Sequence, residues 1–342
     1  MAIEKRAPSR REVLKLTAVA GIGLALGAGT VTDLVRRARL HRVSVTRTRL
    51  GTAVNITVIH PDSARAHALV DGAFAEFERL EGIFSRYRAG TAVARLNAEG
   101  VLHDAPSELL HVMGRALDYA RATDGAFDVT VAPVLNLYVS RFAASDVGPT
   151  DDEVAAALAL VGWRGVRVEG GTIALEKPGM AVTMDGIAKG FIVDQAVAHL
   201  MGAGAERVIV EAGGDMGAAG AERDPWQVSV QDPHDLGASL GVLELRGEAL
   251  ASSGDYMQYF TPDRRLNHII DPRTGRSPER SAGTTVRHRT AMDADATSTS
   301  VFVLGPVEGI AFLDRTEGAE GMLVTKSGEK VTSKSFGAPA TV

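Results

Sequence analysis

Between residues 43 and 60 the chain alternates apolar and polar positions. The apolar members are Val43, Val45, Val54, Ile56 and Val58, and the triplet Leu50-Gly51-Thr52 separates the two groups. A period of two is typical of strands that bury one face, and a glycine between two such runs favours a turn. We therefore expect two strands joined at residues 50–52.

Further along, apolar residues recur every three or four positions, which is the period of a helix with one buried side. This spacing predicts helices over residues 64–84, 107–123, 151–160, 186–201 and 294–304. Ser107 is expected to cap the second helix, and Thr150 with the acids after it to open the third.

Shorter apolar runs predict strands over residues 207–210, 226–230, 240–246 and 249–252, a hairpin over 166–175 turned by Gly170-Gly171, and a final hairpin over 321–325 and 329–333. Strands and helices do not follow the regular strand–helix–strand rhythm of a parallel sheet. The fold class is therefore predicted to be α+β. No linker divides residues 43–342, which are expected to form a single mixed α/β catalytic unit.

The first 29 residues have the plan of an export signal. Arg10-Arg11 precede an apolar, Gly/Ala-rich stretch over residues 16–28, which predicts a twin-arginine signal segment over 1–29 and a charged linker over 30–42. The alternative is a buried helix, which four glycines at about 1 kcal/mol each disfavour. We expect a protein exported to the periplasm or the extracytoplasmic face of the membrane. An uncleaved segment would be a weak membrane tether.

Composition removes several classes of function. The chain has no cysteine, so a disulfide framework, a thiolate metal site and a cysteine nucleophile are excluded. A net charge of −5 and an aromatic content of 5% argue against nucleic acid as a partner.

Three polar clusters carry candidate chemistry. The first, residues 183–190, is a small-residue turn that leads into a helix with Lys189 in its first turn, an arrangement that favours a phosphate group. The second, residues 211–217, contains Gly213-Gly214, which permits a close backbone approach to a ligand. Each cluster by itself is also compatible with an ordinary tight turn.

The third cluster comprises residues 252–256, 267–275 and 293–299. Asp295 and Thr299 are four positions apart, so on a helix they lie on one side, one turn from each other. A carboxylate and a hydroxyl so placed suit Mg²⁺ bound together with substrate phosphates. The alternative is that Asp293 or Asp295 caps the start of the helix.

Taken together, the clusters resemble the ApbE family of FAD:protein FMN transferases. The resemblance runs from about Leu50 to Gly305 and includes the runs 84–88, 95–97 and 123–133 in the order of the family. Tyr87 resembles the transferase members more than the hydrolytic ones. The run Thr183-Met184-Asp185-Gly186 is similar to the subgroup associated with nitrous-oxide respiration.

The resemblance implies roles for particular residues. A magnesium ion would be held by the backbone carbonyl of Gly186, by Asp295 and by Thr299, with Ser298 nearby. Residues expected to line the FAD site are Leu50, Tyr87, Ala92, Val93, Ala94, Asp128, Lys189, His268 and Ile269. His268 is the expected general base, and the Asp271-Pro272 turn is expected to orient its ring. Asp255 and Asp271 are the next candidates for that base.

The implied reaction transfers FMN from FAD to a threonine or serine hydroxyl of an acceptor flavoprotein and releases AMP. The acceptor is expected to be a membrane or extracytoplasmic subunit. Two other functions stay open, which are hydrolysis of FAD to FMN and AMP, and binding or delivery of a flavin without catalysis. The chain departs from the family pattern at Thr183, Asp185, Val129 and Glu211-Ala212. These departures leave intact the side of the helix that is predicted to bind the metal. They bear on the choice of acceptor.

Overall fold

An eight-stranded antiparallel sheet forms the centre of the molecule. The computed structural model describes residues 40–337. Its strand order is β1-β2-β6-β7-β10-β11-β12-β13. Their bounds are β1 His41–Arg49, β2 Thr52–His60, β6 Arg207–Ala212, β7 Asp215–Ala219, β10 Ala249–Gly254, β11 Ser281–His288, β12 Glu320–Thr325 and β13 Lys330–Thr332. Helices and strands alternate irregularly along the chain, which confirms the predicted α+β class.

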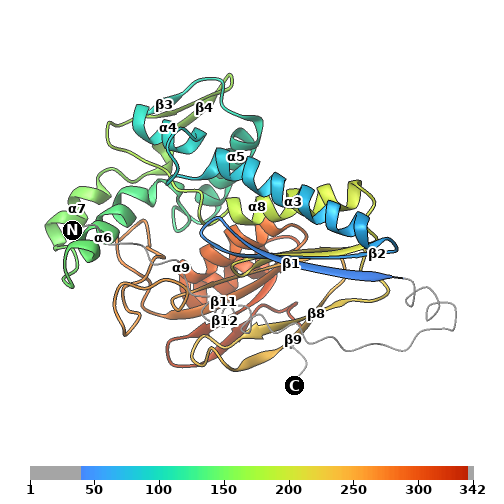
Figure 1. Cartoon of the computed structure of the whole chain (residues 1–342). Helices are drawn as coiled ribbons and strands as arrows, with labels where there is room; N and C mark the ends of the chain where they lie inside the picture. Colours follow the sequence, from blue (N-terminus) through green and yellow to red (C-terminus); the bar gives the residue numbers. More distant parts are fainter. Residues whose placement is uncertain (1–39, 338–342) are drawn as a thin grey trace.

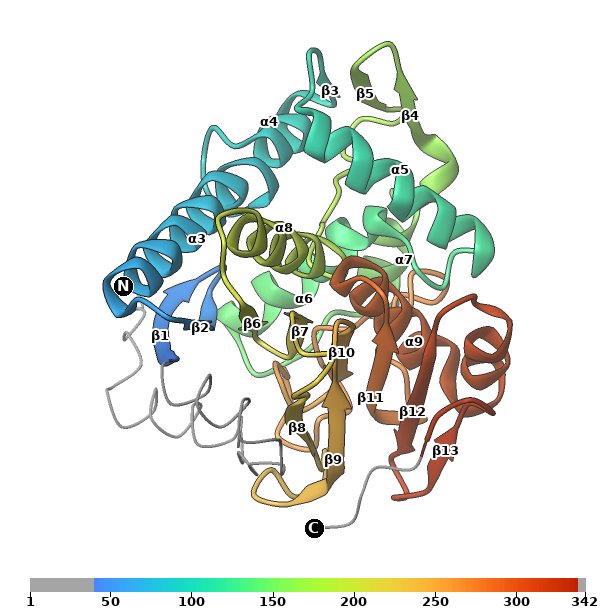
Figure 2. The same ribbon diagram turned by 90° about the vertical axis from the view of Figure 1, so that its right-hand side faces the viewer.

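Three helices cover one face of this sheet (Figure 1). They are α3 Ser63–Phe84, α8 Ala188–Gly202 and α9 Ala291–Arg315. Alternation within the strands directs Val54, Ile56 and Val58 of β2 into the core beneath these helices. Ile59 and Ile209 face the other way, toward the hairpin of β8 Trp226–Gln231 and β9 Ser239–Leu245. Figure 2 shows that hairpin on the side of the sheet opposite α3 and α8.

The remaining elements gather beyond one end of α3 and α8 (Figures 1 and 2). They comprise α4 Ala92–Glu99, α5 Ser107–Ala122, α6 Ala132–Ala144, α7 Asp151–Leu158 and a three-stranded sheet of β3 Val101–Leu102, β5 Thr172–Leu175 and β4 Val166–Glu169. Two short 3₁₀ helices, η1 Val129–Val131 and η2 Trp163–Gly165, connect them.

Several sequence-based boundaries were wrong. Ser107 makes no capping hydrogen bond, because α5 has Pro106 at its N-cap position. Helix α9 begins at Ala291, three residues before the prediction, because the Thr290 side chain accepts from the backbone of Asp293. Strand β1 begins at His41, so the last residues of the predicted linker 30–42 belong to the sheet. Helices α4 and α6 and strands β7 and β11 were not predicted.

The predicted signal segment, residues 1–29, lies outside the described residues. In the described part, α9 is the one helix long and apolar enough to cross a membrane. It is a core helix here, because it carries the buried residues Asp293 and Asp295 and packs between β10 and β12.

Candidate active site

The site forms where α8 and α9 cross. Gly190 permits the crossing, since a Cβ at this position would lie 2.1 Å from the carbonyl oxygen of Ala291. The Asp194 carboxylate on α8 accepts hydrogen bonds from the backbone of Ala291 (2.7 Å) and Met292 (2.9 Å). These bonds satisfy amides at the N-terminus of α9 that lack helical partners. The two helix starts are thereby fixed against each other.

This crossing gathers a partly exposed lysine and two buried carboxylates. Lys189 at the start of α8 forms an ion pair with Asp215 of β7. Its ammonium nitrogen also lies 3.9 Å from the Asp295 carboxylate on α9. The Asp295 carboxylate accepts a hydrogen bond from the backbone of Gly190 at 3.2 Å. Two carboxylates thus share one ammonium group.

Burial disturbs the titration of this cluster. It raises the pKa of Asp295 to about 8, and the neighbouring Asp215 contributes to the rise. Burial also raises the pKa of Asp215, and Lys189 opposes that rise. Burial acts against the charge of Lys189, but Asp215 and Asp295 hold its pKa above its usual value. The cluster is short of positive charge, which is the condition that a bound cation would relieve.

The predicted metal-binding residues meet beside this cluster. Thr299 lies one turn after Asp295 on α9, and a Cβ on Gly186 would be 3.2 Å from the Thr299 hydroxyl. The hydroxyl of Ser298 contacts the Asp295 carbonyl (3.0 Å) and Ser253 of β10 (2.8 Å). It therefore ties α9 to the sheet.

The donors predicted for this place are the Asp295 carboxylate, the Thr299 hydroxyl and the Gly186 carbonyl. No cluster of three or more His, Asp or Glu side chains able to hold a metal occurs among residues 40–337. A protein cage for a metal is thus absent from that part of the chain. A few hard oxygen donors beside a charge-deficient carboxylate fit Mg²⁺, which keeps part of its coordination for water and substrate phosphates.

His268 lies on the long loop between β10 and β11. Its Nδ1 atom is 2.9 Å from the backbone oxygen of Gln258. Since a carbonyl oxygen only accepts, Nδ1 carries the hydrogen and Nε2 keeps a lone pair. Burial lowers the pKa of His268. The ring is therefore neutral at pH 7 and can accept a proton at Nε2.

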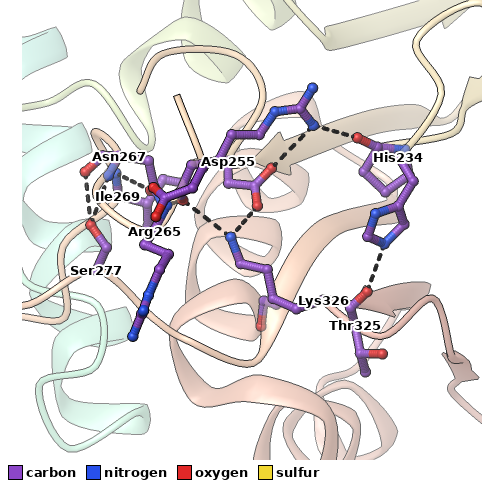
Figure 3. A network of polar contacts seen from close by, with 12 residues as sticks. His234, Asp255, Arg265, Asn267, Ile269, Ser277, Thr325 and Lys326 are labelled. Atoms are coloured by element: carbon purple, nitrogen blue, oxygen red, sulfur yellow. Dashed lines mark hydrogen bonds and ion pairs between the residues drawn. The ribbon is translucent and has the colours of Figure 1, made fainter. Parts of the chain in front are cut away.

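The other two predicted acids at this loop are engaged elsewhere. Asp271 forms a bidentate pair with Arg273, at 2.9 and 2.8 Å. The hydrogen bond that orients the His268 ring joins it to the carbonyl of Gln258. A role of the Asp271-Pro272 turn in that orientation stays a prediction. Asp255 is buried and ion-paired with Lys326 (Figure 3). Both carboxylates are ion-paired, and their use as a base stays a prediction.

The residues predicted to line a flavin site come from several elements. Leu50 lies in the β1–β2 turn, where its φ is 52°, and Ala92, Val93 and Ala94 form the first turn of α4. Asp128 is buried and accepts from Thr130 and from the backbone of Trp163 (2.8 Å). Ile269 packs with Phe302 in a small apolar cluster. Their contact with a flavin stays a prediction.

Tyr87 is held by Arg86, a residue to which the sequence analysis assigned no role. Tyr87 is 74% exposed. Arg86 donates to the Tyr87 hydroxyl at 2.6 Å and to the Asp185 carboxylate at 3.2 Å, and its guanidinium lies 4.4 Å from the ring centre. Tyr87 is thereby linked to the turn that contains Gly186.

Two further acids, Asp215 and Glu211, lie near the site. Asp215 follows Gly213-Gly214 directly, and its position after a paired-glycine turn was the available signal. Glu211 is the next-to-last residue of β6 and accepts from the backbone of Gly214 at 3.0 Å. Burial raises the pKa of Glu211 to about 7.

Fold and site together define a class of α+β proteins with a buried lysine–carboxylate cluster, hard oxygen donors and a neutral imidazole. The chain belongs to the ApbE family, whose model matches residues 50–323. This confirms the resemblance found in the sequence.

Named relatives agree with that assignment. The chain is 33% identical over 277 residues to the FAD:protein FMN transferase of Vibrio cholerae, a match that covers 78% of this chain and 83% of the relative. The solved flavin transferase ApbE from Vibrio cholerae has a TM-score of 0.75 and 31% identity, with 87% of this chain and 98% of that chain covered. The ApbE protein from Thermotoga maritima gives a TM-score of 0.79 at 27% identity, with coverages of 86% and 98%.

Proposed function

We propose that this protein transfers the FMN part of FAD to a threonine or serine hydroxyl of an acceptor flavoprotein. The acceptor oxygen forms a bond to the FMN phosphorus, the bond from that phosphorus to the bridging oxygen breaks, and AMP leaves with that oxygen. The hydroxyl proton is taken up, so FAD and the acceptor give flavinylated protein and AMP. The observation that carries this proposal is the neutral His268 ring. The same chain holds the Lys189–Asp215–Asp295 cluster. Named relatives in its family are FAD:protein FMN transferases.

His268 supplies the base in this proposal. A hydroxyl is a weak nucleophile unless a neighbouring group accepts its proton. The Nε2 lone pair of His268 would accept that proton while Nδ1 stays bonded to Gln258. Removing a general base typically lowers a rate by about 10²–10⁴-fold.

Asp295, Thr299 and the carbonyl of Gly186 would hold a magnesium ion. When bound, Mg²⁺ would neutralise pyrophosphate charge and help to orient it. Lys189 keeps its own charge beside Asp295 and adds to the positive field at the N-terminus of α8. Asp215 holds that lysine in place.

Export by the twin-arginine route is part of the proposal. The motif Arg10-Arg11 and the apolar stretch after it support it. The acceptor would then be a membrane or extracytoplasmic flavoprotein, and a link to nitrous-oxide respiration stays a prediction.

A purified-component assay tests the activity. The protein would be incubated with FAD, Mg²⁺ and an acceptor peptide that contains threonine, with in-gel flavin fluorescence and AMP release both recorded. Covalent fluorescence with AMP release is the expected result. AMP with free FMN would indicate a hydrolase, and binding of FAD without AMP would indicate a delivery protein. His268→Ala should bind FAD within about tenfold of the wild-type affinity while transfer collapses.

A further inference from the structure

Lys326 lies after the last residue of the family match, at the end of β12, and contacts the loop that carries His268 at three places. Its ammonium group pairs with Asp255 at the beginning of this loop. The same group donates to the backbone oxygen of Arg264 at 3.1 Å, and the Lys326 backbone donates to Arg280 at 3.1 Å. One residue thus holds the beginning, the middle and the end of residues 255–280.

The contact at Arg264 continues to His268. The oxygen of Arg264 also accepts from the side-chain amide of Asn267 at 3.2 Å. Asn267 is fully buried, and its side-chain oxygen accepts from the backbone of Ile269 at 3.0 Å. Asn267 and Ile269 are the two neighbours of His268 in the chain. The backbone on both sides of the imidazole is therefore fixed through one hydrogen-bonded path.

Ser277 fixes the same backbone from the far side of the loop. Its hydroxyl donates to the oxygen of Asn267 and accepts from the nitrogen of Asn267, both at 3.0 Å. Figure 3 shows Asn267 between Ser277 and the Asp255–Lys326 pair. Near His268 the loop is thus held by Ser277 and by the path through Lys326, and the latter connects it to the residue that follows β12 of the main sheet.

The conformation at Arg264 needs support from its surroundings. Its φ is 58°, in the left-handed region that an arginine adopts at a cost. Asp255 is 3% exposed, so its charge depends on a nearby cation. Lys326 provides that cation, while the guanidinium of Arg264 lies 3.8 Å from the carboxylate.

We infer that Lys326 is a positioning residue for His268, acting through the Arg264 carbonyl and Asn267. Its contribution to the reaction is the orientation of the imidazole. The expected effect of Lys326 on the transfer reaction rests on the proposed function, whereas its expected effect on the loop 255–280 does not.

Trypsin provides a readout of the loop that is independent of activity. Arg264 and Arg265 are adjacent near the tip of the loop, so local opening exposes two cleavage points. The variants are Lys326→Met, the double variant Lys326→Met with Asp255→Asn, Lys326→Arg, and Lys330→Met as a control. The double variant removes both charges of the pair and is expected to keep the fold, because the single variant leaves the buried Asp255 without its lysine partner. Lys330 is exposed on the neighbouring strand β13.

Cleavage after Arg264 or Arg265, mapped by mass spectrometry, should be faster by about tenfold in both variants that lack Lys326. The kcat for transfer should fall by about 10- to 100-fold, because a displacement of about 1 Å is enough for that loss. KM for FAD should stay near wild type. Lys326→Arg should restore much of both properties, and Lys330→Met should behave as wild type.

An unchanged cleavage rate in the double variant would overturn the inference. So would faster cleavage with wild-type kcat, because the loop would then open without consequence for His268. Failure of the proposed function would appear differently, as an absence of transfer in wild type and Lys330→Met alike, and the cleavage comparison would still decide whether Lys326 holds the loop.

Discussion

His268 shows at the scale of one residue how a backbone contact determines chemistry. The Gln258 carbonyl selects the tautomer that leaves Nε2 free, and burial keeps the ring unprotonated. The oxygen of Gln258 also accepts from the His268 backbone at 3.1 Å, so it holds both the ring and the main chain of His268. A substitution at Gln258 would therefore not remove the contact.

The pH dependence of kcat follows from this. Only the neutral ring accepts a proton, so activity is lost as pH falls through the pKa of His268. Burial is the main cause of the lowered pKa, and Lys189 acts in the same direction, so the acid limb should lie below about 6.5. The profile would be measured at saturating Mg²⁺ and FAD. A limb above 6.5, or the same limb in the residual activity of His268→Ala, would assign the titration to another group.

Asp295 provides a second prediction at this scale. Asp295→Ala should leave the fold intact and lower transfer by at least about 100-fold, because a cation ligand is lost. Calorimetric titration of Mg²⁺ with FAD present would measure the binding. Glu308→Ala, on the exposed part of the same helix, is the control. Unchanged affinity and activity in Asp295→Ala would remove this residue from the metal site.

Spacing alone identified Asp295 and Thr299, because a period of four places two residues on one side of a helix. Spacing did not show which residues Arg86 and Asp215 contact, although Asp215 lies in the cluster 211–217 that the sequence singled out. Their partners, Asp185 and Lys189, are distant in sequence and meet them only after the sheet has formed. The orientation of His268 also could not be predicted, because every residue has a backbone oxygen and the residue type does not show which oxygen accepts the bond.

At the scale of elements, the site depends on how closely α8 approaches α9. Gly190 has no side chain, and the Ala291 carbonyl occupies the space that a Cβ would take. Asp194 then bonds the first amides of α9. Together these residues bring Lys189 within reach of Asp295.

Gly190→Ala should therefore damage both stability and the site. The obstructing atom belongs to the backbone, so the helices must move apart, at a cost of about 1–3 kcal/mol or more. Gly202→Ala is the matched control, because a Cβ at the other end of α8 meets nothing within 4 Å. Urea unfolding would report the stability, and Mg²⁺ titration the site. Equal stability of the two variants would contradict the close-approach argument.

Helix α9 shows what the sequence could predict about an element. Its apolar period was visible, but its start was placed three residues late, because Thr290 is one of several residues in that run able to cap. Helices α4 and α6 were missed for a related reason. Helix α4 is short, with only Val93 and Leu96 buried, so its periodic signal is weak.

At the scale of the whole molecule, the described chain combines one antiparallel sheet, with helices on one face and a hairpin on the other, and a second group of helices around a three-stranded sheet. The fold class could be predicted because strand alternation and helical periodicity are local patterns. The order of strands could not, since β2 pairs with β6 across more than a hundred residues of intervening chain. Family motifs supplied the function, which the local patterns alone left open.

Export is the prediction that concerns the chain beyond the described residues. Replacing Arg10 and Arg11 by lysine keeps the charge but should leave the protein in the cytoplasm, because a receptor reads the arginine pair. Fractionation with an immunoblot would measure the distribution. Normal extracytoplasmic protein in the double-lysine variant would contradict twin-arginine export.

The central claim is that a hydroxyl, and not water, receives FMN from FAD. The intact mass of a threonine-containing acceptor peptide tests it most directly, after incubation with FAD, Mg²⁺ and the protein. We predict that the peptide gains the mass of FMN less one water, with one AMP released per modified peptide, and that a threonine-to-valine peptide gains nothing. An unmodified threonine peptide beside equal amounts of free FMN and AMP would contradict the claim.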